Sequence, residues 1–285
     1  MDARTKLCCL IGSPVAHSLS PLIHNTLAEK MGINMAYIAF CVDPASVGDA
    51  VRGAQAMKFG GLNVTVPHKC AVMDYLCGTD PLAQNIGAVN TLVATGNGFK
   101  GYNTDIIGLK RELLEENVGI KGKSVIILGA GGASNAITYL CADMGAEHIW
   151  LLNRSVEKAK TLADRVNGRF GNLVEPMALS EYHNIPKGRY PVIQTTSVGL
   201  FPNTDNAPVE DDDFYELVSE GVDIIFNPAE TKFMKKCKKA GAPAYNGLKM
   251  LLYQGIASFE LWNNVEVPQK LADEVLEMLK KELGY

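Results

Sequence analysis

Long hydrophobic runs and a large excess of charge of one sign are both missing from this sequence of 285 residues. Its longest apolar stretches are far too short to span a bilayer. The 27 lysine and arginine residues nearly balance the 31 aspartate and glutamate residues, and the net charge is −4. Because a basic surface is the usual mark of proteins that bind nucleic acids or anionic membranes, the composition favours neither kind of partner.

Cysteine or histidine pairs with the spacing of metal ligands are missing too. The seven cysteines are an odd number, form no CxxC pair and are scattered through apolar contexts. Residues 1–4 run straight into an apolar, strand-like segment, without the apolar core and cleavage site of a signal peptide. We therefore expect reduced core thiols, a cytoplasmic location and no metal site.

What the chain does contain is the pattern of an α/β protein. It is 47% hydrophobic and 20% charged, and short apolar runs alternate with amphipathic helical stretches. This alternation is typical of α/β architecture with mostly parallel sheets. We predict strands at 7–11, 35–41, 61–66, 88–93, 124–128, 148–152, 192–196 and 222–226. We predict helices at 20–31, 47–57, 69–76, 106–116, 156–166, 246–262 and 268–284, and one more directly after the strand at 124–128.

The alternation starts afresh near residue 106, which predicts two domains. One comprises residues 1–105 together with residues 246–285, whose closing helices return to it, and the other comprises residues 106–245. Local signals also predict helix starts. Ser20 is expected to be an N-cap with Pro21 at the first helical position, and Asn246 is expected to cap the long helix that follows.

A glycine-rich turn follows the predicted strand at 124–128 and opens a helix. Gly129 permits the tight turn, Gly131 lets the backbone approach a pyrophosphate at the helix N-terminus, and Ser134 takes the third glycine position of GxGxxG. The residues predicted to bind a dinucleotide in this turn are Gly129, Ala130, Gly131, Gly132 and Ala133. The pattern predicts a Rossmann-like, doubly wound domain.

The end of the next strand predicts which dinucleotide binds. It reads Asn153, Arg154 and Ser155, with Lys158 one helical turn later. NAD-binding folds usually carry a carboxylate here to hold the ribose 2′-hydroxyl, whereas cations suit a 2′-phosphate. We therefore predict NADP as the cofactor, with NAD as the alternative that Glu157 supports. A solvated basic helix start is the purely structural interpretation.

Three polar clusters lie where strands of the first domain meet loops. They are Ser18 with Ser20, then Asn63 with Thr65 and Lys69, then Asn90 with Asp105. Ligands of open α/β sheets bind beyond the carboxyl ends of the strands, and a Lys–Asp pair can pass a proton while hydride leaves the adjacent carbon. Each residue also has a structural interpretation, as a helix cap, a solvated lysine or a partner of turn backbone.

Together these motifs resemble the shikimate dehydrogenase family over nearly the whole chain. The matching segments are SLSP at 18–21, NVTVPHK at 63–69, AVNT at 88–91, NTD at 103–105, GAGGA at 129–133, NRS at 153–155 and GLKML at 247–251 with Gln254. The resemblance implies a substrate-binding domain and an NADP-binding domain. It further implies reversible hydride transfer between shikimate and 3-dehydroshikimate in aromatic amino-acid biosynthesis. We expect small-molecule partners and a monomer or homodimer.

The resemblance also implies a role for each matched residue. Lys69 and Asp105 would be the catalytic pair, and Ser18 and Ser20 would bind the substrate carboxylate. The residues around the ring hydroxyls would be Asn63, Thr65, Asn90 and Gln254. The residues at the NADP phosphate would be Asn153, Arg154, Ser155 and Lys158, and those further along the cofactor would be Leu200, Phe226 and Gly247, with Leu200 beside the nicotinamide.

Some residues depart from the family pattern. Phe226 replaces a tyrosine whose hydroxyl helps to hold the carboxylate, and losing such a bond costs about 1.5–3 kcal/mol. Gln194 opens a segment that often begins with Asn, Leu200 replaces Met, and Asn246 replaces Asp. Two alternatives follow. One is a quinate/shikimate dehydrogenase that uses NAD, and the other is a weakly active paralogue that acts as a metabolite-binding module.

Overall fold

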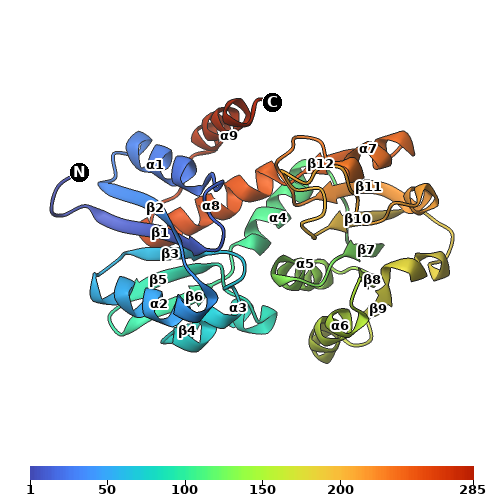
Figure 1. Ribbon diagram of the computed structural model, residues 1–285, viewed down its shortest axis with the longest axis horizontal. Helices are drawn as coiled ribbons and strands as arrows, with labels where there is room; N and C mark the ends of the chain where they lie inside the picture. Colours follow the sequence, from blue (N-terminus) through green and yellow to red (C-terminus); the bar gives the residue numbers. More distant parts are fainter. The chain divides into compact units, whose positions relative to one another are not determined.

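The computed structural model describes residues 1–285, which form two compact units (Figure 1). The first contains Met1–Gly108 and Leu252–Gly284, and the second contains Leu109–Leu251 and Tyr285. The sequence predicted boundaries at 105 and 246, beside the ends of α4 (Asp105–Glu115) and α8 (Leu248–Asn263). Instead, each of these helices lies partly in both units, since α4 is divided after Gly108 and α8 after Leu251. No helix is both long enough and apolar enough for a membrane span.

The first unit is built on a mixed sheet with the strand order β2-β1-β3-β5-β6-β4. Its strands are β1 (Lys6–Gly12), β2 (Met35–Cys41), β3 (Gly61–Val64), β4 (Gly78–Thr79), β5 (Thr91–Thr95) and β6 (Gly98–Tyr102). β1 runs parallel to β2 and β3, whereas β5 is antiparallel to β3 and β6. The helices are α1 (Ser20–Lys30), α2 (Val47–Ala56), α3 (Pro81–Ile86) and α9 (Gln269–Leu283), with 3-10 turns η1 (Pro44–Ser46) and η2 (Ala71–Tyr75). Helix α9 and residues 252–263 of α8 belong to this unit.

The side chains of strand β3 alternate between the two faces of this sheet. Successive residues of a strand point to opposite faces, so Leu62 and Val64 join the apolar core that α2 covers. Gly61 and Asn63 face α8 instead. A Cβ on Gly61 would collide with the indole ring of Trp262, so only glycine fits there. The alternation therefore places the one polar side chain of β3, Asn63, against α8.

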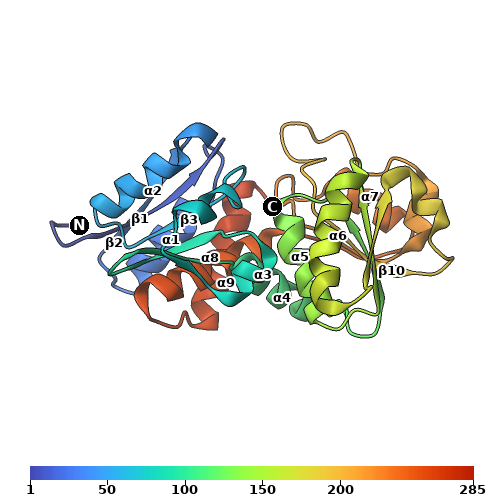
Figure 2. The same cartoon turned by 90° about the horizontal axis from the view of Figure 1, so that it is seen from below.

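The second unit is a fully parallel sheet with the order β12-β11-β10-β7-β8-β9. Its strands are β7 (Ser124–Leu128), β8 (His148–Asn153), β9 (Val174–Ala178), β10 (Tyr190–Gln194), β11 (Val218–Asp223) and β12 (Ala244–Asn246). The helices are α5 (Gly132–Asp143), α6 (Val156–Phe170) and α7 (Lys232–Lys239), with 3-10 turns η3 (Leu179–Asn184) and η4 (Asp212–Leu217). Figure 2 shows α5 and α6 on the same side of the strands. The strand order reverses between β7 and β10, which is where doubly wound folds bind ligands.

Several predicted elements have different ends in the structure. Leu19 is the N-cap of α1, and Ser20 is already its first helical residue, so the predicted cap at Ser20 was wrong. The helix predicted at 69–76 is only the 3-10 turn η2. The strand predicted at 222–226 ends at Asp223, because the Asp223 carboxylate accepts a hydrogen bond from the Ile225 backbone N–H and turns the chain. Strands β4, β6, β9 and β12 and helices α3 and α7 were missed.

Candidate functional site

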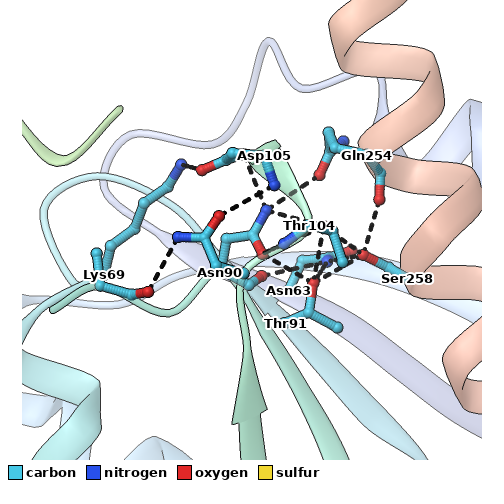
Figure 3. Close-up of polar contacts among 10 residues, drawn as sticks. Asn63, Lys69, Asn90, Thr91, Thr104, Asp105, Gln254 and Ser258 are labelled. Atoms are coloured by element: carbon cyan, nitrogen blue, oxygen red, sulfur yellow. Dashed lines mark hydrogen bonds and ion pairs between the residues drawn. The ribbon is translucent and has the colours of Figure 1, made fainter. Parts of the chain in front are cut away.

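The Lys69–Asp105 pair is formed in the first unit. Lys69 lies in the turn between β3 and η2, where its backbone carbonyl accepts a hydrogen bond from Val89, and Asp105 is the first residue of α4. The Lys69 Nζ is 2.7 Å from the Asp105 Oδ2, and the two side chains are only 14% and 7% exposed (Figure 3). Because water screens so little of this pair, its charges interact more strongly than those of a surface ion pair.

Asn90 orients the carboxyl group of Asp105. The Asn90 Oδ1 accepts a 2.7 Å hydrogen bond from the backbone N–H of Thr104, so the amide has only one orientation. The Nδ2 must then face Asp105, and it donates to Oδ1 over 2.9 Å. Both oxygens of Asp105 therefore accept hydrogen bonds, one from Asn90 and one from Lys69. An ionised carboxylate paired with the Lys69 ammonium satisfies this arrangement.

Three buried hydroxyl groups lie behind Asn90, and the sequence predicted a role for none of them. Thr91, Thr104 and Ser258 are each 0% exposed. The Ser258 Oγ is 2.7 Å from the Thr91 Oγ1 and 3.1 Å from the Thr104 Oγ1, and Thr104 contacts Asn90 (Figure 3). Ser258 lies four residues after Gln254 on α8, so helical spacing was the signal that could have placed both on one face.

Asn63 connects these three hydroxyl groups to α1 and β2 through hydrogen bonds. Its Nδ2 lies 3.0 Å from the Ser258 Oγ and 3.1 Å from the Thr91 Oγ1, and its Oδ1 accepts from the Tyr37 hydroxyl over 2.7 Å. His24, fully buried and stacked on Tyr37, lies 3.1 Å from the same oxygen. Burial lowers the pKa of His24 to about 3, so it stays neutral. The amide of Asn63 is thus occupied by protein partners, which favours a structural role over direct ligand binding.

Of the other residues predicted to touch substrate, Ser18 and Ser20 follow β1, Thr65 follows β3, and Gln254 lies on α8. Ser20 is 6% exposed, and its backbone N–H donates a 3.2 Å hydrogen bond to the Ser18 Oγ. Thr65 is half-buried beside the end of β1. A Cβ on Gly12 would collide with the Thr65 Cγ2, so glycine at 12 makes room for this side chain. Gln254 is brought to Asn90, with its Oε1 3.5 Å from the Nδ2.

The glycine turn of the second unit has the geometry that its sequence predicts. Gly129 has φ +111°, and a Cβ there would lie 2.6 Å from the Thr195 Oγ1. Gly131 is the N-cap of α5, and a Cβ added to it would meet nothing within 4 Å, so its exposed face is open. The first turn of α5 carries no acidic residue. An open backbone at a helix N-terminus without a carboxylate suits an anionic pyrophosphate.

The loop after β8 holds the predicted phosphate-binding residues. The Asn153 Nδ2 donates to the Ser155 carbonyl over 2.8 Å, which shapes the loop. Arg154 and Lys158 are exposed, and neither is paired with a carboxylate. The Ser155 hydroxyl donates to Glu157 over 3.1 Å. Two unpaired cations fit a 2′-phosphate, and the adjacent Glu157 is the group that would suit a 2′-hydroxyl.

Leu200, Phe226 and Gly247 lie in three neighbouring segments of the second unit. Leu200 follows β10, Phe226 follows β11, and the loops meet where the Phe201 backbone N–H donates to the Asn227 carbonyl. A Cβ on Gly247 would collide with the carbonyl oxygen of Ile224. Gly247 therefore allows close approach of two backbones, which is a structural reason for glycine at this position.

Comparison with known protein families assigns the three parts of the chain consistently. Residues 10–92 match the shikimate dehydrogenase substrate binding domain, residues 112–187 match the shikimate / quinate 5-dehydrogenase family, and residues 247–277 match the shikimate 5'-dehydrogenase C-terminal domain.

Individual relatives agree over nearly the full length. A protein of Caldanaerobacter subterraneus subsp. tengcongensis named shikimate dehydrogenase (NADP(+)) is 42% identical, covering 92% of this chain and 93% of its own. The solved chorismate mutase/shikimate 5-dehydrogenase fusion protein of Clostridium acetobutylicum has a TM-score of 0.89 at 35% identity, covering 99% of both chains. The shikimate 5-dehydrogenase of Listeria monocytogenes, solved with shikimate and NAD, has a TM-score of 0.88 at 30% identity, covering 98% of both.

Proposed function

Because this chain belongs to the shikimate dehydrogenase family, we propose that it catalyses reversible, NADP-dependent hydride transfer between shikimate and 3-dehydroshikimate. The observation that carries the proposal is the sheltered Lys69–Asp105 pair, with 2.7 Å between Nζ and Oδ2. A protein that only binds a metabolite has no need of such a proton-transfer pair, which argues against the metabolite-binding module.

The first unit is the proposed site of shikimate. Ser18 and Ser20 bind the carboxylate, and Thr65, Asn90 and Gln254 contact the ring hydroxyls together with the catalytic pair. The structure supports a different part for Asn63, whose amide already has protein partners on both of its atoms. We propose that Asn63 orients the residues around it.

The second unit is the proposed site of NADP. Gly129–Ala133 form the pyrophosphate turn, and Asn153, Arg154, Ser155 and Lys158 surround the 2′-phosphate. Support comes from the open space at Gly131, the absence of an acidic residue in the first turn of α5, and the two unpaired cations. Leu200, Phe226 and Gly247 belong to the segments proposed to line the rest of the cofactor.

In the proposed reaction, the substrate hydroxyl lies at the Lys69–Asp105 pair. Bound NADP supplies the acceptor for the hydride, which leaves the carbinol carbon with the electron pair of its C–H bond. The pair takes the hydroxyl proton as the carbonyl forms, and returns it in the reverse direction. Before the transfer, the Asn90 Nδ2 is held toward the Asp105 Oδ1, so the carboxylate is oriented to accept the proton directly or through Lys69.

A two-by-two assay tests this proposal. Shikimate or quinate is mixed with NADP or NAD, and the absorbance of the reduced nicotinamide is followed. We expect shikimate with NADP to give the highest kcat/KM. Lys69→Ala should lower it on the order of 100-fold or more, since general acid–base groups contribute that much. The exposed Lys187→Ala is the matched control and should match the wild type. Lack of turnover with all four combinations would overturn the proposal.

A second candidate is a quinate/shikimate dehydrogenase that uses NAD. Glu157 favours it, because a carboxylate beside the β8 loop is the usual partner of a ribose 2′-hydroxyl. Phe226 favours it too, since a residue without a hydroxyl leaves room near the carboxylate for the extra hydroxyl of quinate. The same assay decides, because this candidate requires quinate and NAD to give the highest kcat/KM. The cytoplasmic location and the monomeric or dimeric state stay predictions, and light scattering measures the second.

A further inference from the structure

Three fully buried polar side chains fix the loops that follow β10 and β11. Gln194 ends β10, Asp223 ends β11, and Thr231 is the N-cap of α7; all three are 0% exposed. The Thr231 hydroxyl donates to the Asp223 Oδ2 over 2.7 Å, and the Gln194 Nε2 donates to the Oδ1 over 3.3 Å. We call these three residues the Asp223 cluster.

Gln194 and Asp223 also hold backbone of their own loops. The Gln194 Oε1 accepts a 2.5 Å hydrogen bond from the Thr196 N–H, and its Nε2 donates to the Thr196 and Val198 carbonyls. Asp223 accepts from the Ile225 N–H over 3.0 Å. The backbone contacts leave the Gln194 amide only one orientation, so its Nε2 must point to Asp223. Every neighbour of the Asp223 carboxylate is therefore a donor.

The loop after β10 is bonded directly to the glycine turn. The Thr195 Oγ1 donates to the Leu128 carbonyl over 2.7 Å and lies 2.5 Å from the Oγ of Ser134, which is buried in α5. The second loop joins the first through the Phe201 N–H, which donates to the Asn227 carbonyl over 3.0 Å. The positions of Leu200 and Phe226 thus depend on the Asp223 cluster, whereas Gly131 and Arg154 make no contact with it.

The charge of Asp223 is expensive to bury. No lysine or arginine contacts the carboxylate, and burial raises its pKa to about 7. A buried carboxyl group without a cationic partner needs hydrogen-bond donors to offset its lost hydration. Three donors converge on Asp223, and together they hold two loops beside the cofactor turn.

We propose that Asp223 and Gln194 are positioning residues that set the geometry of the nicotinamide end of the cofactor site. The inference rests on the proposed function. Hydride transfer depends steeply on placement, and a displacement of about 1 Å can cost on the order of 100-fold in rate. Loosening the two loops therefore lowers kcat, while the KM for NADP changes little, because the glycine turn and the β8 loop hold the opposite end of the dinucleotide.

The test uses variants of nearly unchanged shape in the full-length protein. Asp223→Asn replaces one acceptor by a donor, and Thr231→Val removes the hydroxyl. We expect each to lower kcat by about 10-fold to 100-fold, with the KM for NADP within about 3-fold of the wild type. Thr231→Ser, which keeps the donor, should restore most of kcat. Thr138→Val is the control, since Thr138 is a buried hydroxyl of the same unit that has no hydrogen-bond partner.

A second readout needs no substrate. The fluorescence emission of bound NADPH reports the surroundings of its nicotinamide ring. Both variants should therefore lose most of the emission enhancement that NADPH shows on binding to the wild type, while their Kd for NADPH stays similar. Wild-type kcat and emission in Asp223→Asn and Thr231→Val would overturn the positioning role alone, as would equal loss in Thr231→Ser. If the wild type binds NADPH with full emission enhancement but turns over no substrate, the proposed function is overturned. The positioning role is then judged from the emission of the variants alone.

Discussion

Phe226 differs from the residue that the family resemblance implies at this position. It lies half-buried in the loop after β11, where the family resemblance implies a tyrosine that helps to hold the substrate carboxylate. Phenylalanine cannot donate a hydrogen bond. The loop itself is well anchored, because Asp223 and Thr231 fix both of its ends. The departure therefore concerns one hydroxyl group rather than the local backbone.

Restoring that hydroxyl predicts tighter substrate binding. Phe226→Tyr should lower the KM for shikimate on the order of 10-fold to 100-fold, since a hydrogen bond to a charged group contributes about 1.5–3 kcal/mol. Steady-state kinetics at saturating NADP measures it. Phe201→Tyr is the matched control, because Phe201 is 62% exposed and its new hydroxyl would face water. Equal KM values for wild type and Phe226→Tyr would mean that position 226 does not face the carboxylate.

At the scale of elements, the turn between β7 and α5 separates two uses of glycine. Gly129 is required by conformation and space, since it has φ +111° and its missing Cβ would collide with Thr195 and Thr196. Gly131 has an ordinary φ of −92° and open space around it. Neither backbone conformation nor packing requires glycine at 131, and the open space there suits the proposed pyrophosphate site.

This contrast gives a paired prediction. Gly131→Ala should leave Tm within about 2 °C of the wild type and raise the Kd for NADP on the order of 10-fold or more, because the methyl group occupies the approach of the pyrophosphate. Gly129→Ala should lower Tm clearly, since both φ and space oppose it. Thermal unfolding and calorimetric titration measure the two effects. Unchanged NADP affinity in Gly131→Ala would contradict the proposed pyrophosphate site.

A second element-scale feature is the buried carboxyl of Glu112, which joins α4 to the start of α8. Glu112 is 1% exposed, its Oε2 accepts a 2.9 Å hydrogen bond from the Met250 N–H, and its Oε1 has no partner. Burial, helped by the nearby Glu116 and Glu115, raises the pKa of Glu112 from 4.5 to about 8, although the Met250 hydrogen bond and Lys249 act to lower it. The folded protein therefore holds this proton more tightly than the unfolded chain.

Stability should consequently depend on pH through Glu112. Its contribution is fully present below pH 4.5 and is lost as the pH rises through about 8. Glu112→Gln keeps an acceptor for Met250 but cannot ionise. We expect the variant to gain in free energy of unfolding relative to the wild type between pH 5 and pH 9, as urea unfolding would measure. The exposed Glu147→Gln should track the wild type. A difference between Glu112→Gln and wild type that stays constant with pH would refute the prediction.

For the molecule as a whole, each compact unit buries its own apolar core, one between β1, β3, β5 and α2 and the other around β7, β8 and β10. Each therefore supplies a rigid frame for one ligand. Substrate contacts are proposed for the loops of the first unit and dinucleotide contacts for those of the second.

Amide hydrogen exchange tests the proposed assignment of substrate to the first unit and of NADP to the second. NADP alone should protect amides at 129–134 and in the loops after β8, β10 and β11, because its phosphates and nicotinamide order those segments. Shikimate should protect amides near 18–20, 63–69 and 90–105. Mass spectrometry of the two complexes locates the protected peptides, and a catalytically silent Lys69→Ala protein serves for the ternary complex. Protection by NADP confined to the first unit would reverse the assignment.

The amino-acid sequence determined the features that depend on neighbours in the chain. Periodicity predicted most strands and helices, and the glycine turn follows from backbone requirements within a few residues. Tertiary structure alone decided which polar side chains meet. Asn63 and Ser258 are 195 positions apart, and Gln194 and Asp223 are 29 apart, so no local pattern announces their contacts. Hydrogen bonds and burial act through space, and only the folded sheet brings these groups within their short reach.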